Sequence, residues 1–287
     1  MRTALIDGDV FIFQAASANE YEIQWDHWLW TLHADLDASI AHFDHLIADL
    51  KEAAQADKVI LALTDTSNWR KDVMPTYKHN RLKVRKPIVY QPMRQYCQEK
   101  YKTYMRPTLE GDDVLGILAT HPTLIKGEKV IVTIDKDLKT VPGVHLRLDD
   151  PERKTRIISV EEADRFHLLQ TLAGDATDGY PGCPGVGMVT GERLLEDGRA
   201  LVPVEKIISR GPRKGATETE WIPSDNPATP WEIVVSAYRK AGLGEEAALQ
   251  NARVARICRH TDYDFKKKEV RLWNPGSVPA PSVRSCD

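Results

Sequence analysis

The chain has 287 residues, 42% of them hydrophobic and 28% charged, as is typical of a globular protein with one large or two small domains. No apolar run is long enough to span a bilayer, and Asp7 and Asp9 interrupt the opening apolar run, which excludes a signal-peptide pattern. The four cysteines are scattered without ligand spacing, so we expect free thiols and an intracellular, cytoplasmic protein. The net charge of −3 neither supports nor excludes a nucleic-acid partner, because a concentrated acidic pocket can leave a positive surface elsewhere.

The chain opens with a short apolar run, residues 3–6, that ends at Asp7-Gly8-Asp9 and predicts a buried strand followed by a turn. Between residues 32 and 50, apolar side chains recur at spacings of three and four, which predicts an amphipathic helix. Three tryptophans precede this stripe or overlap its start, and we expect them to be packing groups, with a base-stacking platform as the alternative: Trp25, Trp28 and Trp30.

A second apolar run, residues 58–64, predicts another strand, and Asp65 follows it directly. The next stretch, residues 69–87, is strongly basic, and Asp72 is its only acid. Such a stretch can present positive charge to phosphate groups. Its basic residues are Arg70, Lys71, Lys78, Arg81, Lys83, Arg85 and Lys86.

Residues 107–113 read Pro-Thr-Leu-Glu-Gly-Asp-Asp and run into an apolar segment that predicts a helix. Glu110, Asp112 and Asp113 fall within four positions and repel one another. The helix dipole stabilises acids in the first turn by about 0.3–1 kcal/mol each, although a cap needs only one acid. A hard cation such as Mg²⁺, which prefers oxygen ligands, would also offset the repulsion. This stretch alone therefore allows either a metal site or an acid-rich helix start.

A clear strand over residues 130–134 is followed by Asp135 and Asp137, and residues 144–148 and 155–160 predict further strands. Strands that alternate with helices predict an α/β fold with a mostly parallel central sheet flanked by helices. In such sheets, ligands bind beyond the carboxyl ends of the strands. We therefore expect Asp7, Asp65, Glu110 and Asp135 to converge on one edge of the sheet.

The second half begins with a predicted helix over residues 163–172, after which Asp175 and Asp178 are spaced to share one face of a turn. The Gly/Pro-rich segment 181–187 fits either a close approach to a phosphate backbone or a plain connection between helices. Residues 203–230 are irregular, and their basic loop, with Arg210, Arg213 and Lys214, either touches nucleic acid or is merely solvated. Helices are expected over residues 231–240 and 244–259, a strand over 269–273 and a disordered tail from residue 275.

Nine acids at five places in the chain would repel one another strongly if they met without cations. Subtracting these nine carboxylates from the net charge of −3 leaves +6 for the remainder of the chain. They suffice to hold two divalent ions about 4 Å apart, a pair that suits phosphodiester hydrolysis. The absence of Cys or His at ligand spacing favours Mg²⁺ or Mn²⁺ over zinc. The nine are Asp7, Asp65, Glu110, Asp112, Asp113, Asp135, Asp137, Asp175 and Asp178.

Six motifs occur in one order along the chain: ILALTD, YKHNR, LEGDD, TIDKD, GDATDGYPG and GCPGVG. Together they resemble the flap endonuclease or structure-specific 5′-nuclease superfamily, and the order and wording are most similar to the 5′→3′ exonucleases of short-tailed phages. The resemblance covers residues 1–273. It implies a two-metal phosphodiesterase with two Mg²⁺ ions, which Mn²⁺ can replace, acting at 5′ ends or junctions of duplex DNA, with flap and RNA–DNA hybrid activity and 5′-phosphorylated products.

The resemblance also implies roles for particular residues. The nine acids become metal ligands or their supports, with Asp113 as an indirect contributor in one alternative, while Asp9 has no counterpart. Lys78 and Arg81 would grip the scissile phosphate, and Tyr77 would stack on the terminal base. Gly182, Gly185 and Gly187 would belong to a helix–hairpin–helix element that holds the duplex backbone, with a K⁺ ion at its loop. Further DNA contacts are expected from Arg70, Lys83, Arg85, Lys86, Arg213 and Lys214.

The implied organisation is an α/β nuclease core over residues 1–162 with a basic arch at about 70–106, a helix–hairpin–helix region over 163–273, and a disordered tail over 274–287. One rival interpretation is a haloacid-dehalogenase-type phosphatase, in which Asp7-Gly8-Asp9 would supply an aspartyl nucleophile and an acid/base. It leaves LEGDD, YKHNR and the Gly/Pro segment unexplained. Another rival is a non-catalytic DNA-binding module, which would gain nothing from so many acids.

Overall fold

The computed structural model describes residues 1–212 and 214–276. The chain divides into two compact units that interleave along the sequence. Unit 1 consists of Met1–Asp72, Asn80–Ala163 and Ile257–Arg271, and unit 2 consists of Val73–His79, Asp164–Arg256 and the segment from Leu272. The short segment Val73–His79 therefore belongs to unit 2, although its neighbours on both sides belong to unit 1.

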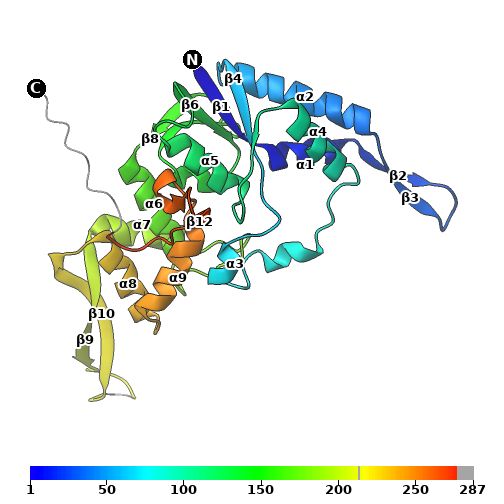
Figure 1. The fold of residues 1–287 in the computed structure, drawn as a ribbon. Helices are drawn as coiled ribbons and strands as arrows, with labels where there is room; N and C mark the ends of the chain where they lie inside the picture. The colour runs from blue at the N-terminus through cyan, green and yellow to red at the C-terminus, as the bar shows by residue number, and fades with distance from the viewer. Residues whose placement is uncertain (213, 277–287) are drawn as a thin grey trace, which may run out of the picture. The chain divides into compact units, whose positions relative to one another are not determined.

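Unit 1 is built on a six-stranded sheet with the order β5-β4-β1-β6-β7-β8 (Figure 1). Strand β1 pairs in parallel with β4 on one side and β6 on the other, and only β8 runs antiparallel to its neighbour. This arrangement confirms the predicted α/β fold with a mostly parallel central sheet flanked by helices. The strands are β1 (Arg2–Asp7), β4 (Lys58–Ala62), β5 (Thr103–Tyr104), β6 (Glu128–Thr133), β7 (Gly143–Arg147) and β8 (Thr155–Ile158).

The central strands are apolar on both faces because helices cover the sheet on both sides. On β1, Ala4 and Ile6 belong to the core beneath helices α1 (Gly8–Ala18), α2 (Leu36–Ala53) and α4 (Tyr90–Lys100), together with Phe43 and Met93. Leu5, which is fully buried outside this cluster, points to the opposite face, since side chains alternate along a strand. Helix α5 (Gly111–Thr120) packs on β1, β4 and β6 there.

The predicted helix over residues 32–50 begins later than expected. Residues Glu20–Gln24 and Trp30–Ala34 form an antiparallel hairpin, β2–β3, and Leu32 lies in β3. Helix α2 begins at Leu36 because Asp35 is extended and its Oδ1 accepts a hydrogen bond from Ala38 N at 3.0 Å, which caps the helix. The expectation that the tryptophans pack inside is wrong, because Trp25, Trp28 and Trp30 are 61%, 88% and 53% exposed.

Smaller elements complete unit 1. The segment predicted as an arch contains α3 (Arg70–Val73), the 3₁₀ helix η1 (His79–Lys83), α4 and β5, and its part Val73–His79 belongs to unit 2. The strand expected near residue 269 is β12 (Glu269–Val270), which pairs with β11 (Tyr263–Asp264). Two further 3₁₀ helices are η2 (Asp137–Thr140) and η3 (His260–Asp262).

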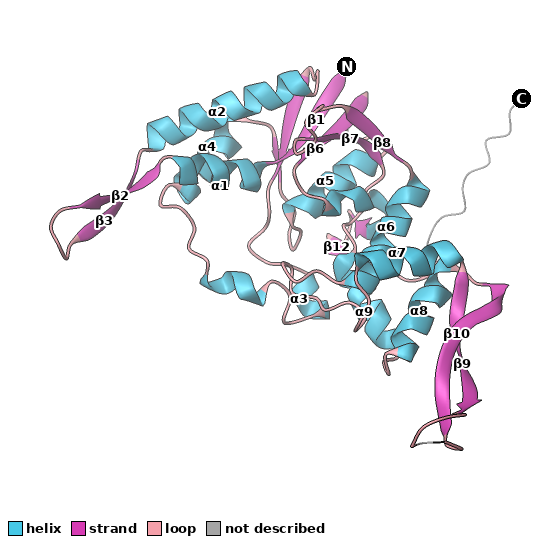
Figure 2. Ribbon diagram, turned by 180° about the vertical axis from the view of Figure 1, so that it is seen from behind, coloured by secondary structure: helices cyan, strands magenta, loops and turns pink. Residues whose placement is uncertain are grey.

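Unit 2 contains the helices that the second half of the sequence predicts. Its core includes Leu168, Leu172, Ile233, Tyr238 and Ala252. The irregular region 203–230 forms a long antiparallel hairpin, β9–β10, whose strands run together in Figure 2. The helix expected to reach residue 259 ends at Ala255, because the next residue is extended. The elements are α6 (Val160–Ala173), α7 (Met188–Asp197), β9 (Arg199–Ile207), β10 (Thr217–Pro227), α8 (Pro230–Lys240) and α9 (Glu245–Ala255).

Two predictions concern parts of the chain that the structure describes incompletely. Residues 277–287 of the disordered tail predicted over 274–287, and Arg213, a predicted DNA contact, lie outside the described residues. Within the described ranges, no helix combines the length and the apolar character that crossing a membrane requires.

Candidate active site

The acids that follow the strands of unit 1 lie at one edge of its sheet. Asp7, the last residue of β1, pairs in register with Ala62, the last residue of β4. On the other side, Ile6 pairs with Val132, one residue before β6 ends. Asp65 and Asp135 follow β4 and β6 within three residues, so the parallel pairing brings these strand ends to the same carboxyl edge.

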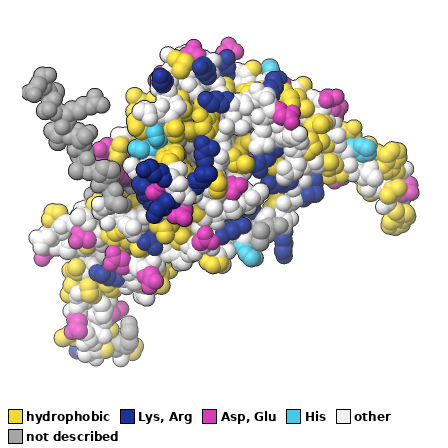
Figure 3. Space-filling model, in the orientation of Figure 1, with side chains coloured by type: hydrophobic (Ala, Val, Ile, Leu, Met, Phe, Trp, Pro, Cys, Tyr) yellow, Lys and Arg dark blue, Asp and Glu magenta, His cyan; other side chains and the backbone are white. Residues whose placement is uncertain are grey.

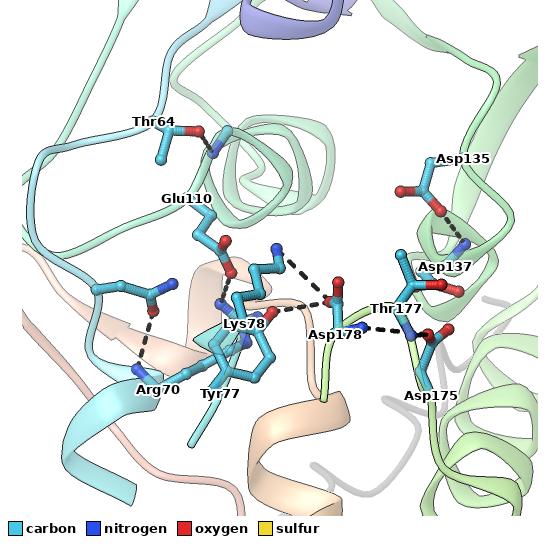
Figure 4. Close-up of polar contacts among 12 residues, drawn as sticks. Thr64, Arg70, Tyr77, Lys78, Glu110, Asp135, Asp137, Asp175, Thr177 and Asp178 are labelled. Carbon is cyan, nitrogen blue, oxygen red and sulfur yellow. Dashed lines mark hydrogen bonds and ion pairs between the residues drawn. The ribbon is translucent and has the colours of Figure 1, made fainter. Parts of the chain in front are cut away.

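The first turn of α5 reaches the same edge. Gly111 N donates a hydrogen bond to Thr64 Oγ1 at 3.0 Å, which ties the helix start to the chain just after β4 (Figure 4). A Cβ atom added to Gly111 would lie 3.3 Å from Asp7 Oδ1. Asp7 therefore lies against the start of α5, next to Glu110, which caps this helix, and Asp112, which lies in its first turn.

The carboxyl of Asp7 at this edge is strongly perturbed. Its Oδ1 accepts hydrogen bonds from Asp9 N at 3.0 Å and from Val10 N at 3.4 Å, so it caps helix α1. Burial raises the pKa of Asp7 to about 7, with further contributions from the negative charges of Asp9 and Asp135. A carboxyl held close to neutral by burial and by like charges becomes ionised when a cation binds beside it.

The carboxylate of Asp9 is hydrogen-bonded to residues next to this edge. Its Oδ2 accepts a hydrogen bond from Thr64 N at 2.6 Å, and its Oδ1 accepts one from Tyr90 Oη at 2.7 Å. The Nε atom of Arg94 lies 3.8 Å from Oδ1. Because both carboxylate oxygens are held within the fold, Asp9 is poorly placed to act as the mobile acid/base that a phosphatase would need.

The other strand-end acids are partly exposed and held by local turns. Asp65 Oδ2 accepts hydrogen bonds from Ser67 Oγ at 2.6 Å and from Thr108 N at 2.8 Å. The first of these contributes most to a pKa of Asp65 that is lowered to about 2. Asp135 Oδ1 accepts a hydrogen bond from Asp137 N at 2.7 Å (Figure 4). These two side chains are therefore oriented by backbone groups, which leaves part of each carboxylate exposed.

Asp113 and Arg70 form a buried ion pair, which corrects two predictions. Asp113, a predicted metal ligand, is fully buried, and Arg70, a predicted DNA contact, is 2% exposed. Arg70 Nη1 and Nη2 each lie 2.7 Å from an oxygen of Asp113, and Nη1 lies 3.0 Å from Glu110 Oε2. The oxygens of Asp113 also accept hydrogen bonds from Cys258 N at 2.9 Å and Trp69 Nε1 at 3.0 Å.

This pairing fixes the charge of Asp113. Although burial alone would raise the pKa of Asp113, the Arg70 guanidinium and the hydrogen bonds from Cys258 and Trp69 lower it. Both oxygens are saturated with donors, so neither can coordinate a metal ion without breaking the pair. Asp113 and Arg70 therefore orient Glu110 from inside unit 1.

In unit 2, Asp175 organises the turn that follows α6. Asp175 Oδ1 accepts hydrogen bonds from Thr177 N at 2.7 Å and from Asp178 N at 3.3 Å (Figure 4). Its backbone pairs with Tyr180, which closes the turn. The predicted proximity of Asp175 and Asp178 is confirmed, since the first carboxylate holds the backbone of the second.

The same turn binds the segment that carries Lys78. Lys78 N donates to Asp178 O at 2.8 Å, Tyr77 Oη donates to Asp178 Oδ2 at 2.9 Å, and Lys78 Nζ lies 3.5 Å from Asp178 Oδ2 (Figure 4). The ring of Tyr77 is 3% exposed and packs with Met74 and Tyr180. In this structure Tyr77 positions Asp178, and the predicted stacking of Tyr77 on a terminal base stays a prediction.

The glycines of the Gly/Pro segment have different roles. Gly182 is buried with φ +67°, its N donates to Asn251 Oδ1 at 3.0 Å, and a Cβ there would lie 2.3 Å from Gly174 N. This corrects the predicted contact of Gly182 with DNA, because its backbone N–H is already bonded to Asn251 inside unit 2. Gly185 and Gly187 lie in the exposed loop before α7, with nothing within 4 Å of an added Cβ.

Most of the predicted basic contacts are exposed. Arg81 and Lys83 lie on η1, and Lys214 lies at the turn of the β9–β10 hairpin. Arg85 forms an ion pair with Glu20, and Lys86 Nζ lies 4.2 Å from the centre of the Tyr90 ring. The exposed members of the set remain available to a phosphate backbone. Arg85 must exchange Glu20 for a phosphate to make such a contact.

The supporting residues around these acids are the ones that sequence reasoning missed. Thr64, Tyr90 and Arg94 hold Asp9 or its neighbours, and Trp69 contacts Asp113. Their sequence positions carry no spacing signal, because each lies more than 40 residues from its partner. Among the described residues, no three His, Cys, Asp or Glu side chains already stand close enough to enclose a metal ion. The predicted ligand set therefore stays a prediction.

Comparison with known sequences gives the family. Residues 2–165 match the sequence model of the 5′-3′ exonuclease N-terminal resolvase-like domain. The chain is 36% identical to the exodeoxyribonuclease of Enterobacteria phage T3 over 286 residues, covering 95% of this chain and 93% of the relative. It is also 36% identical to the exonuclease of Escherichia phage T7, covering 94% and 93%. A flap endonuclease Xni of Shewanella pealeana is 29% identical over 166 residues, covering 54% of this chain and 64% of the relative.

Solved structures give the same fold. A structure of the phage T5 5′-exonuclease with divalent zinc ions bound has a TM-score of 0.57 at 14% identity, covering 89% of both chains. That likeness concerns the fold, whereas the family rests on the sequence matches. Since the family model spans more than half of the chain and two phage exonucleases match nearly all of it, the chain belongs to the 5′-3′ exonuclease family and is a nuclease of that family.

Proposed function

We propose that this chain is a two-metal 5′→3′ exodeoxyribonuclease that hydrolyses phosphodiesters at the 5′ ends of duplex DNA and leaves 5′-phosphorylated products. Activity on flaps and on the RNA strand of RNA–DNA hybrids is part of the proposal. The names of the relatives, exodeoxyribonuclease and flap endonuclease, support the reaction class. The observation that carries the proposal is the shared carboxyl edge of β1, β4 and β6, where Asp7, Asp65 and Asp135 follow three neighbouring strands and Asp7 lies against the start of α5.

The donor set at this edge fits a hard divalent cation. The side chains are carboxylates, and burial first and like charges second raise the pKa of Asp7, so a cation would relieve an electrostatic cost that the fold already carries. When bound, such ions supply a nucleophilic hydroxide and stabilise the leaving oxygen. We assign the ligands in unit 1 to Asp7, Asp65, Glu110, Asp112, Asp135 and Asp137, and their supports to Asp9 and Asp113.

In unit 2, Asp175 and Asp178 are proposed to support the second ion, and Lys78 is proposed to act on the phosphate. Lys78 Nζ lies 3.5 Å from Asp178 Oδ2, and both side chains are about one-sixth exposed. A weak, partly solvated pair keeps the ammonium charged and oriented while leaving it free to exchange its partner for a phosphate oxygen. Lys78 and Arg81 would then neutralise the negative charge that builds on the scissile phosphate.

Duplex binding is proposed for the exposed loop between α6 and α7. Gly185 and Gly187 let the backbone of this loop approach a phosphate closely, and helix α7 begins directly after it. The helix–loop–helix arrangement supports the proposed helix–hairpin–helix element, and a K⁺ ion at its loop is part of the proposal. Further phosphate contacts are proposed for Lys83, Arg85, Lys86 and Lys214.

The test compares a 5′-labelled blunt duplex, a flap and an RNA–DNA hybrid, each with Mg²⁺, with Mn²⁺ and with EDTA. We expect Mg²⁺-dependent release of 5′-phosphorylated products and its loss in Asp135→Asn. The matched control is Asp150→Asn, a change in a partly exposed loop acid beyond the end of β7, which should retain the wild-type rate. Cleavage that persists in EDTA, or equal rates for both variants, would refute the proposal.

A further inference from the structure

A cavity of about 760 Å³ lies at the amino edge of the sheet in unit 1, the edge opposite the strand-end acids. Its walls are the end of α2, the first residues of β4, the connection between α4 and β5, and the loop before β6. A strand of six residues, such as β1, separates the two edges of the sheet by about 20 Å. This amino-edge cavity is therefore distinct from the candidate active site, and its volume lies in the range of natural ligand sites, about 300–1,000 Å³.

The floor of the amino-edge cavity is aliphatic. Ile47, Ile60 and Ile125 line it and are at most 7% exposed, so they belong to the packed interior. Leu124 also lines the cavity and is 40% exposed. Among the described residues, Tyr101 is the only aromatic one in the wall, and its hydroxyl donates to Asp44 Oδ1 at 2.7 Å. The cavity therefore offers an apolar side chain a place to leave water.

Exposed lysines from four different segments surround this floor: Lys51, Lys58, Lys102 and Lys126. Among residues 1–212 and 214–276, none of the four forms an ion pair with a carboxylate. Lys51 lies in the last turn of α2, where it complements the helix dipole. The other three lie outside helices, so that role does not account for them. Figure 3 shows dark blue Lys and Arg side chains among yellow hydrophobic ones at the top of unit 1, where β1 begins in Figure 1.

The two acids in the wall do not neutralise these lysines. Asp44 is already occupied, because its Oδ2 accepts a hydrogen bond from Lys100 Nζ at 2.6 Å and its Oδ1 accepts one from Tyr101. Asp57 Oδ2 accepts a hydrogen bond from Arg2 N at 2.6 Å. With Asp44 and Lys100 set aside as a pair, four lysines against one aspartate leave a formal charge of +3 around the cavity.

Charge and lining together identify the class of occupant. An aliphatic floor with a basic border is complementary to an acidic segment that carries a bulky apolar side chain. Nucleic acid fits this cavity less well, because its phosphates would meet aliphatic carbons inside the cavity. Bases stack on exposed aromatic faces, and the floor is made of isoleucines instead.

We propose that the amino-edge cavity binds an acidic peptide segment of a partner protein. A large apolar side chain of that segment enters the floor beside Leu124, and flanking carboxylates meet Lys58 and Lys126. The apolar anchor supplies most of the affinity, and the lysines orient the segment and exclude basic ones. A partner bound at this edge leaves the carboxyl edge free, so it can hold the nuclease while the nuclease acts on DNA.

The experiment uses the full-length protein in EDTA at low salt, without DNA. The probe is a fluorescein-labelled peptide with two adjacent leucines flanked on both sides by aspartates, and its affinity is measured by fluorescence anisotropy. We expect the double variant Lys58→Glu/Lys126→Glu to bind it at least about tenfold more weakly. Added salt should weaken binding to the wild type. The matched control is Lys267→Glu, a charge reversal at an exposed lysine in the turn between β11 and β12, which should bind as the wild type does.

Two further peptides and one further variant separate the two parts of the proposal. Peptides with asparagines in place of aspartates, or with serines in place of leucines, should bind poorly to the wild type. Leu124→Ser, which removes an exposed apolar group without changing the charge, should weaken binding of the leucine peptide several-fold. Thermal denaturation and the rate of DNA cleavage should be unchanged in this variant and in the double variant.

Three results would overturn the proposal. The first is absent binding of the acidic peptide to the wild type, or unchanged affinity in both the double variant and Leu124→Ser. The second is equal binding of the asparagine or the serine peptide. The third is that the double variant weakens duplex or single-strand DNA binding by a comparable factor, which would make the lysines a nucleic-acid surface.

Discussion

The two acid–base pairs Arg70–Asp113 in unit 1 and Lys78–Asp178 in unit 2 consist of similar groups but differ in burial and geometry. The first pair is at most 3% exposed, its shortest N–O distance is 2.7 Å, and further donors saturate the carboxylate. The second is 17% and 16% exposed, with an N–O distance of 3.5 Å. A guanidinium in a dry site holds a carboxylate by two parallel bonds, whereas an ammonium at the surface remains exchangeable. Burial therefore separates the structural pair from the one that we propose to meet the substrate.

Arg70→Met should have the largest effect on stability. It leaves the charge of Asp113 buried without its partner, a change that costs about 3–5 kcal/mol of unfolding free energy. Urea denaturation measures this loss, and Lys71→Ala, at an exposed neighbouring position, serves as the control. The double variant Arg70→Met/Asp113→Leu should recover part of the loss because no buried charge remains. A loss below about 1 kcal/mol in the single variant would contradict the structural role.

Lys78→Ala should show the opposite profile. The pair with Asp178 is partly solvated, so stability should change by about 1 kcal/mol or less. Turnover should fall by about 10²- to 10³-fold, as for other groups that stabilise charge in the transition state. Single-turnover cleavage and duplex affinity are measured together. An equal loss in both quantities would reduce Lys78 to a phosphate anchor and would weaken the contrast between the two pairs.

Asp7 offers a third case, a partly buried carboxyl that lies near the acids Asp9 and Asp135, and it adds a pH dependence to the comparison. Its pKa is raised to about 7 in the fold from an unfolded value of 3.8, so the folded state binds its proton more tightly. In the absence of divalent cations, this group therefore lowers stability as pH rises from about 4 to 7. Asp7→Asn should remove that part of the slope and stabilise the metal-free protein at pH 8 by about 1–2 kcal/mol.

Thermal denaturation of wild type and Asp7→Asn at several pH values between 5 and 8 measures the difference. Added Mg²⁺ should stabilise the wild type more than the variant, because only the wild type keeps the carboxylate. Identical pH slopes for the two proteins would contradict the perturbed state of Asp7.

The sheet and its carboxyl edge were predictable because the signal is local. Each apolar run of four to seven residues is followed by an acid, and parallel pairing then brings Asp7 and Asp135 to one edge whatever lies between them. The start of α5 at Gly111 was likewise marked by its acids. These features need only the pattern of neighbouring residues and one topological rule.

The roles of Asp113 and Gly182 were not predictable, because they depend on partners far away in the chain. Asp113 accepts hydrogen bonds from residues 43 and 145 positions away, so an acid in a metal-ligand motif carries no sign of being occupied. Gly182 packs closely against Gly174, where a side chain would not fit. A loop whose backbone approaches a phosphate needs glycine for the same reason, so the sequence cannot tell the two cases apart. Leu32 fits the spacing of the amphipathic helix predicted over residues 32–50. The pattern therefore did not indicate the β2–β3 hairpin, which contains Leu32 and exposes Trp28.

Tyr77→Phe should have the smallest effect and is the finest test of how the exchangeable pair is positioned. The change removes only the hydroxyl that donates to Asp178 Oδ2, while the buried ring stays in place, so stability should fall by about 0.5–1.5 kcal/mol. If Tyr77 acts by orienting Asp178, turnover should fall several-fold with little change in duplex affinity, and Tyr77→Phe in a Lys78→Ala background should have almost no further effect on turnover. The matched control is Tyr101→Phe, which removes a hydroxyl bonded to Asp44 in unit 1 and should leave turnover unchanged. Additive losses in the double variant would show that Tyr77 and Lys78 act independently, and the pair would then be two separate contacts instead of one positioned group.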